Sequence, residues 1–382
     1  MTEDDDRSAW TDLRGTPGGP TPSGMEDLRI PELYLPFPPK DPNPALERAR
    51  TTMDAWLTEY GLCRSAASQR SLRRTQVPLI TALTYPDAAP RTLELLTQWA
   101  TWTFIIDDDF DDGPDGEDPQ RCAAALGTLL PILDGARPGS GASARAFADT
   151  LEHLTSGRSP GWCRMLRDDI RAYLWSYYEG LLDRLTGRTP TLAAYRHRRA
   201  VSVAAYTWLD LTEIAAGIDL PDTVRHLSSF RDLRTAAAEY VGLHNDLWSL
   251  DRDRAAGGFH NAVLLLQQQE HSTSQEAVDQ VNALLSACVH RMTTAETELA
   301  AHLRAAGATD RTRADARTCA DGYRAFVRGC ADYHHQVDRY TRPDPDQSDD
   351  TPTHGIFQPG AHRIDHPGTR VRWTKAVPRG ID

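Results

Sequence analysis

Acidic side chains crowd one short stretch of the sequence, TQWATWTFIIDDDFDD, which has five aspartates in its last six positions. The apolar residues before them recur every three or four positions, which predicts a helix. Asp107 and Asp111 are four apart and therefore share one face at its C-terminal end. Carboxylates there oppose the helix dipole and repel each other, and a cation relieves both effects. Oxygen ligands without nearby His or Cys favour Mg²⁺ or Mn²⁺ over zinc.

Two other interpretations of the acidic stretch compete with a magnesium site. A lone acidic run is most often a solvated loop. A calcium loop also comes into question, because Asp107, Asp109 and Asp111 alternate and Asp118 falls at the twelfth position. This interpretation fails because Asp112 occupies the sixth position, which needs Gly, and because the last ligand is not a bidentate Glu. By itself, the acidic stretch identifies no site.

A second set of oxygen ligands lies in VGLHNDLWSLDRDR. Asn245, Ser249 and Asp253 recur every four residues, so a helix presents all three on one face. An amide oxygen, a hydroxyl and a carboxylate can share one divalent ion and leave coordination sites for phosphate. Arg252 beside them is a candidate to bind a bridging phosphate. His244 falls on a neighbouring face and is interpreted as structural.

Together, the two stretches resemble a known family. D-D-x-F-D, from Asp107 to Asp111, and N-D-L-x-S-x-x-x-D, from Asn245 to Asp253, resemble the two metal motifs of bacterial class I terpene cyclases. The segments LYLPFPPKDPNP and MDAWLTEYGL resemble the start of that family, so the resemblance covers most of residues 30–340. It implies Mg²⁺ as the cofactor, with three ions in the site, or Mn²⁺ in its place.

The same resemblance gives roles to basic residues elsewhere in the chain. Arg199 lies 46 positions before Asn245 (245 − 199), where the family places an arginine that senses diphosphate. Arg339 and Tyr340 match the C-terminal Arg-Tyr pair of the family. The expected catalytic residues are Asp107, Arg199, Arg339 and Tyr340.

Three positions depart from the family pattern. Asp253 stands where Glu is common, and it is one methylene shorter. Ser202 and Val203 follow Arg199 where many relatives place a Gly. The shape of the helix break near Val203, and with it the floor of the pocket, is therefore left open.

The resemblance implies a lyase that ionises an isoprenyl diphosphate. Ions and arginines would neutralise the diphosphate so that it leaves an allylic carbon. Water must then be kept from the carbocation, and aromatic faces can stabilise its charge. Phe104, one turn before Asp107, is the first candidate for such a face, followed by Trp208 and Trp248. The released diphosphate is the expected base for the final deprotonation.

The length of the substrate is the least determined part of this prediction. The family favours farnesyl diphosphate, which would give a cyclic sesquiterpene of undetermined skeleton. Geranylgeranyl diphosphate is the alternative, because Val203, Ala204 and Ala205 are small and would deepen a cavity. A chain-elongating prenyltransferase normally has two Asp-rich motifs, and this chain has one. From a different class, a non-catalytic helical protein whose acids bind cations also stays open.

In the segments that must position these residues, the apolar side chains mostly recur every three or four positions, as in a helix. Stretches rich in Gly, Pro and Asp, for example at 84–90, 113–119 and 186–190, separate the helical segments. We therefore expect an all-α fold of about ten helices, and the resemblance implies a single-domain class I terpenoid synthase bundle around a central apolar cavity. The proline-rich segment 30–44 is expected to lie along the bundle surface. The predicted divisions are a disordered leader over residues 1–28, the cyclase domain over 29–340 and a polar, Pro-rich tail over 341–382.

Composition limits the location and partners of the chain. It has 382 residues, of which 40% are hydrophobic and 25% charged, and it lacks an apolar run long enough to cross a bilayer. Its acidic start and six scattered cysteines favour a soluble protein of the reducing cytoplasm. A formal charge of −12 argues against nucleic acid and membrane as partners. The isoprenyl diphosphate is thus the expected partner, and a homodimer stays open.

Overall fold

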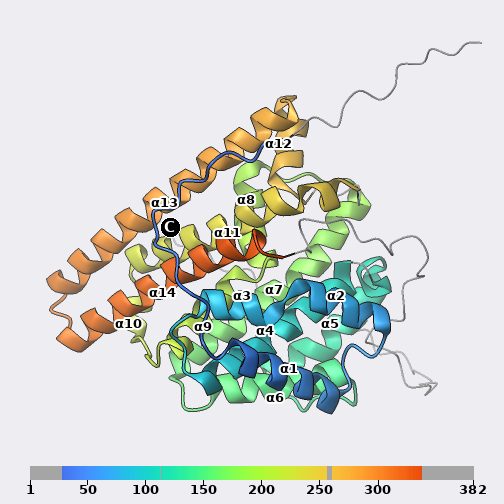
Figure 1. The fold of residues 1–382 in the computed structure, drawn as a ribbon, viewed down its shortest axis with the longest axis horizontal. Helices are drawn as coiled ribbons and strands as arrows, with labels where there is room; N and C mark the ends of the chain where they lie inside the picture. The colour runs from blue at the N-terminus through green and yellow to red at the C-terminus, as the bar shows by residue number, and fades with distance from the viewer. Residues whose placement is uncertain (1–27, 112, 256–259, 338–382) are drawn as a thin grey trace, which may run out of the picture.

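The computed structural model describes residues 28–111, 113–255 and 260–337, and helices are the only regular secondary structure over these residues (Figure 1). The all-α prediction is confirmed. The elements in chain order are α1 (Leu46–Tyr60), α2 (Ala66–Thr75), α3 (Val77–Thr84), α4 (Pro90–Asp111), the 3₁₀ turn η1 (Pro114–Gly116), α5 (Pro119–Leu133), α6 (Ala142–Thr155), α7 (Pro160–Thr186), α8 (Leu192–Ser202), α9 (Ala205–Ala215), α10 (Asp222–Arg225), α11 (Ser228–Ala255), α12 (Ala262–Glu270), α13 (Ser274–Ala305) and α14 (Asp310–His334).

The predicted breaks all fall between helices, but the expected number of helices was too low. The described part of the chain has fourteen α-helices. A short break that sequence reasoning missed separates α2 from α3 at Gln76, whose φ of 49° is left-handed. Such a conformation usually calls for Gly, so a Gln gave no signal there. A break before α13 was also missed, although the start of this helix carries a capping box between Thr273 and Glu276.

The helices that carry the two motifs lie in the middle of the bundle. α4 packs against α1, α3 and α6, and α11 packs against α8, α9, α13 and α14 (Figure 1). α3 lies between α4 and α14. Each motif is therefore surrounded by other helices that can supply contacts to it.

One largely buried arginine joins three helices of the bundle. Arg234 of α11 donates from Nη2 to Asp169 of α7 and to Asp210 of α9, at 2.5 Å in both cases. The same nitrogen reaches the carbonyl oxygen of Tyr206 at 3.1 Å. Removing one member would leave a charge buried without its partner, so this group holds α7, α9 and α11 in a fixed relation.

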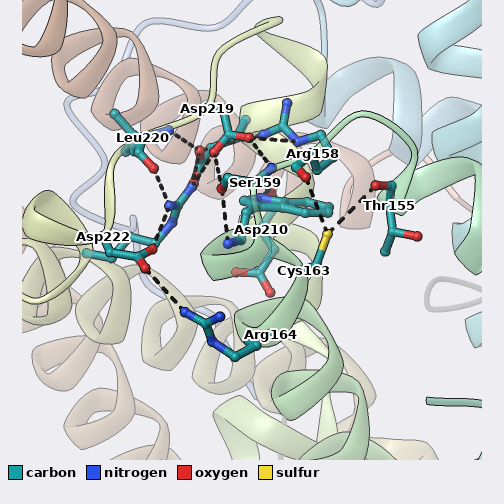
Figure 2. A network of polar contacts seen from close by, with 12 residues as sticks. Thr155, Arg158, Ser159, Cys163, Arg164, Asp210, Asp219, Leu220 and Asp222 are labelled. Atoms are coloured by element: carbon teal, nitrogen blue, oxygen red, sulfur yellow. Dashed lines mark hydrogen bonds and ion pairs between the residues drawn. The ribbon is translucent and has the colours of Figure 1, made fainter. Parts of the chain in front are cut away.

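A second charged network holds the connection between α9 and α10. Arg225 contacts Glu213 at 2.7 Å and Asp219 at 3.1 Å. Asp219 also accepts two hydrogen bonds of 2.7 Å from Ser159, the N-cap of α7. Figure 2 shows the Asp219 carboxylate between Ser159 and Arg158. The C-terminal end of α9 is thereby tied to the start of α7.

Residues 28–43 form no helix and lie along the bundle surface, as their prolines predict. The Arg29 backbone N–H donates to Gln275 of α13 at 3.0 Å. Farther along, Arg328 of α14 donates to the Phe37 carbonyl at 3.2 Å. In Figure 1 this segment is the dark blue line that crosses α13 and α14. None of the described helices combines the length and apolar character needed to cross a membrane.

Candidate active site

A cavity with about 800 Å³ of empty space, counted out to its open mouth, lies between α4, α9, α11 and α14. Its charged and amide side chains are Asp107, Asp111, Arg199, Asn245 and Arg252. Its apolar and aromatic side chains include Phe104, Tyr173, Val203, Trp208, Phe326 and Tyr333. The structure thus brings eight of the predicted site residues to one cavity.

The lining changes character along two of the helices. On α4, Phe104 precedes Asp107 by about one turn, and on α11, Val241 precedes Asn245 by one turn. Both helices therefore present an apolar side chain at one level and a polar one nearer their C-terminal ends. The cavity has a polar end next to an apolar interior, which suits a ligand with an anionic head and a hydrocarbon chain.

Asp107 is held by a chain of hydroxyl groups from α7. The Tyr177 hydroxyl donates to Asp107 Oδ1 at 3.1 Å, and it lies 2.5 Å from the Tyr173 hydroxyl. Tyr173 in turn donates to the Thr103 carbonyl at 3.2 Å. Burial raises the pKa of both tyrosines well above the ordinary value, so both stay protonated and able to donate. Sequence reasoning missed this pair because it lies 70 residues away from Asp107.

The neighbouring acids have other surroundings. Asp108 accepts a hydrogen bond of 2.9 Å from Ser71 of α2. Burial, with smaller effects from Asp108 and Asp115, raises the pKa of Asp109 to about 8. Asp109 Oδ2 is buried and has no hydrogen-bond partner among the described residues. Neither Asp108 nor Asp109 lines the cavity, and Asp112 lies outside the described residues.

The three candidate ligands of α11 share a face, as their spacing predicts, but only Asn245 lines the cavity. The Ser249 hydroxyl donates to Asp253 Oδ2 at 2.6 Å. The same carboxylate oxygen accepts a bond of 3.0 Å from Asn261, the N-cap of α12. Arg252 is about half exposed and lies 3.5 Å from Asp253. The contact between Ser249 and Asp253 places two candidate ligand oxygens next to each other near the end of α11.

Arg199 of α8 is bound to the second motif. Its Nε donates to Asp246 Oδ1 at 2.7 Å, and its Nη2 donates to Asn245 Oδ1 at 2.6 Å. Asp246 is fully buried and also accepts bonds from Tyr195 at 2.6 Å and from the Ala262 N–H at 2.9 Å. Burial alone would lower the pKa of Arg199, but the Asp246 carboxylate raises it on balance, so the guanidinium stays charged. Sequence reasoning missed Asp246, although it is part of the N-D-L pattern.

The helix break left open by the sequence lies at Val203 and Ala204. α8 ends at Ser202, and Ala204, with a φ of 58°, starts α9 from a left-handed conformation. Such a conformation is uncommon for a residue other than Gly. Val203, Ala204 and Trp208, at and just after this break, form part of the cavity wall.

The aromatic part of the cavity differs in one respect from the prediction. Phe104 and Trp208 line it, but Trp248 does not. The Trp248 ring instead packs edge-on against His335, with ring centres 4.5 Å apart. Phe326 of α14 lines the cavity and was not predicted. It belongs to a stripe that steps by three or four residues, and this spacing was the available signal.

His244 is a core residue rather than part of the cavity lining. It is fully buried, and neither ring nitrogen has a hydrogen-bond partner among the described residues. Burial, followed by the charges of His334 and His335, lowers its pKa well below the ordinary value. A neutral ring packed next to α14 fits the structural role expected for it. The remaining predicted residues, Arg339 and Tyr340, lie outside the described residues.

The donor set fits an oxygen-preferring divalent cation. Both motifs lie in the last turns of their helices, where the helix dipole favours positive charge. Their donors are carboxylate, amide and hydroxyl oxygens, the ligands that Mg²⁺ prefers. Within the described residues, no three acidic, His or Cys side chains already surround one point. The candidate ligands are instead divided between α4 and α11.

Comparison with known proteins decides the family. Residues 98–291 match the family model described as "Terpene synthase family 2, C-terminal metal binding", and this range contains both motifs. The chain belongs to the terpene synthase family. It is therefore an enzyme, a lyase of the class I terpene cyclase type that uses divalent metal and an isoprenyl diphosphate.

Individual relatives cover most of the chain. It is 33% identical over 334 residues to (2Z,6E)-hedycaryol synthase of Kitasatospora setae, a match that spans 86% of this chain and 98% of that protein. It is 34% identical over 227 residues to (+)-T-muurolol synthase ((2E,6E)-farnesyl diphosphate cyclizing) of Roseiflexus castenholzii, covering 59% and 69% of the two chains. A solved structure of hedycaryol synthase in complex with HEPES superimposes with a TM-score of 0.73 at 32% identity, covering 82% of this chain and all of that one.

Proposed function

We propose that this terpene cyclase uses Mg²⁺ to ionise farnesyl diphosphate and cyclises the resulting cation to a sesquiterpene. The observation that carries the proposal is the meeting of Asp107 and Asp111 of α4 with Asn245 of α11 at one end of an otherwise largely apolar cavity. Three Mg²⁺ ions, a cytoplasmic location and a catalytic domain over residues 29–340 belong to the same proposal.

The proposed metal ligands are Asp107, Asp111, Asn245, Ser249 and Asp253. Bound Mg²⁺ would supply Lewis-acid charge that stabilises the departing diphosphate. Asn245 Oδ1 already accepts a bond from Arg199, but a carbonyl oxygen has a second lone pair for a cation. Ser249 can keep its hydrogen bond to Asp253 as a ligand, because the hydroxyl oxygen has two lone pairs for a cation.

The basic side chains would bind the diphosphate. Arg199 can keep its Nε bond to Asp246 while its other nitrogens turn to a phosphate oxygen, because the guanidinium has five N–H donors. Arg252 lies at the same end of the cavity and is about half exposed, so it can reach a ligand that enters from solvent. Arg339 and Tyr340 would complete this group as the polypeptide leaves α14.

The apolar part of the cavity would hold the hydrocarbon chain. Phe104, Trp208 and Phe326 supply aromatic faces from three different helices, and such faces stabilise positive charge. They also exclude the water that would quench a carbocation. The name of the Roseiflexus relative specifies a farnesyl substrate, which supports the C15 chain length. Geranylgeranyl diphosphate remains the alternative because Val203 and Ala204 are small.

Incubation with isoprenyl diphosphates tests this proposal. Purified protein with Mg²⁺ would receive the C10, C15, C20 and C25 diphosphates separately, and the extracts would be analysed for terpenes. We expect cyclic C15 products from farnesyl diphosphate and their loss when the metal is chelated. A reaction with Mg²⁺ but no protein controls for spontaneous hydrolysis. If every substrate gave linear alcohols and no cyclic product, cyclase activity would be refuted. If cyclic products formed only from the C20 substrate, the farnesyl assignment would be refuted.

A further inference from the structure

The Asn245 carboxamide lies between side chains from two other helices. Arg199 of α8 donates from Nη2 to Asn245 Oδ1 at 2.6 Å. On the other side, Asn245 Nδ2 lies 3.3 Å from Nε2 of His334, which belongs to α14. All three side chains line the cavity. Both the oxygen and the nitrogen of the Asn245 carboxamide are thus in contact with a side chain of another helix.

The chemistry of these partners allows only one orientation of the amide. A guanidinium can only donate hydrogen bonds, so the group that faces Arg199 must be the carbonyl oxygen. The NH₂ group must then face His334, and His334 Nε2 must accept from it. This requires the imidazole proton to be on Nδ1, which is 2.7 Å from the Cys330 carbonyl oxygen and can donate to it. The bond to Cys330 therefore determines the tautomer of His334, as hydrogen bonds to one ring nitrogen generally do.

The surroundings hold the His334 ring in place. Its side chain is buried, and its ring stacks on Trp248 with an interplanar angle of 17°. The His244 ring lies 5.0 Å away on another side.

We propose that His334 is a positioning residue that directs the Asn245 carbonyl oxygen toward Arg199 and the metal. An aspartate ligand has two equivalent oxygens, but an asparagine turned the wrong way presents N–H donors to a cation. Asn245 is the one amide in the proposed ligand set, so it alone needs such a partner. The inference rests on the proposed metal site and assigns His334 a role apart from contact with the substrate.

Substitutions at His334 separate this role from simple packing. His334→Phe keeps an aromatic ring against Trp248 but removes both nitrogens. His334→Gln keeps an oxygen that can accept from Asn245 and tests rescue by hydrogen bonding. His335→Phe is the matched control, since His335 is exposed and its ring also contacts Trp248. The measurement is the Mg²⁺ concentration that gives half of the thermal stabilisation by inorganic diphosphate, a binding assay that needs no turnover.

We expect His334→Phe to raise this Mg²⁺ concentration by about 10–100-fold, because removal of a hydrogen-bond partner of a metal ligand generally weakens metal binding by that factor. His334→Gln should lie closer to the wild type, and His335→Phe should not change it. In an Asn245→Asp background, His334→Phe should cause no further rise, because a carboxylate needs no orientation. Melting temperatures without metal report on loss of packing separately.

Two results would overturn the role of His334. One is an unchanged Mg²⁺ requirement in both His334→Phe and His334→Gln. The other is an equal rise from His334→Phe with and without Asn245→Asp, which would indicate packing alone. Failure of the underlying metal site would look different, because the wild-type protein itself would then show no Mg²⁺-dependent stabilisation by diphosphate.

Discussion

Replacing Asp107 with Asn is expected to lower kcat/KM for farnesyl diphosphate by about 10²–10³-fold, the loss that typically follows removal of one electrostatic group at a reacting centre. The amide keeps the shape of the carboxylate and can still accept from Tyr177. What it loses is the negative charge that faces the cavity at the C-terminal end of α4. Steady-state kinetics over a range of Mg²⁺ concentrations measure the effect.

Asp109→Asn is the matched control for Asp107→Asn. Because the pKa of Asp109 is raised to about 8, this side chain is mostly protonated at neutral pH, and an amide replaces a group that is already uncharged. Asp109 also lies outside the cavity lining. We therefore expect a much smaller loss from Asp109→Asn. Equal losses from the two substitutions would contradict the assignment of Asp107 as the principal ligand of α4.

Arg199→Lys is expected to lower kcat/KM by at least about 10²-fold, although the charge is kept. Arg199 reaches Asp246 and Asn245 with two nitrogens of one planar group, and a lysine offers a single ammonium. The ammonium cannot keep the contact with Asp246 and also turn to a diphosphate. Kinetic measurements should show the loss in both kcat and kcat/KM, because the contact strengthens as the leaving group gains charge.

Arg198→Lys provides the comparison at the next position. Arg198 pairs with Asp183 at 2.5 Å and is about one-third exposed. Lysine keeps a positive charge beside Asp183, and Arg198 does not line the cavity, so activity should stay close to that of the wild type. If Arg198→Lys and Arg199→Lys lost activity equally, a general disturbance of α8 would explain the result and the diphosphate role of Arg199 would be wrong.

Local periodicity made much of the fold predictable from the sequence. The spacing of four between Ser249 and Asp253 predicted a shared face, and their side chains form a hydrogen bond in the structure. The apolar stripe before Asp107 predicted α4, and clusters of Gly and Pro marked the main breaks. These features depend on residues within a few turns of one another, so the sequence alone contains the information.

Contacts between distant segments were beyond such reasoning. His334 reaches Asn245 from 89 residues away, and Tyr177 reaches Asp107 from 70 residues away. Only the packing of α14 on α11 and of α7 near α4 brings them together. The packing of Trp248 against His334 of α14 has the same cause, since the position of Trp248 on its own helix did not reveal which residue would cover it. The left-handed Ala204 gave no signal because it is not a Gly.

Diffraction from crystals grown with Mn²⁺ and inorganic diphosphate would test the metal clamp most directly, since Mn²⁺ accepts the same oxygen ligands and scatters anomalously. We expect anomalous peaks beside the Asp107 carboxylate and beside the set of Asn245, Ser249 and Asp253, with the diphosphate between them and in contact with Arg199. Peaks confined to acidic side chains outside the cavity, with diphosphate absent from it, would contradict a site shared by α4 and α11.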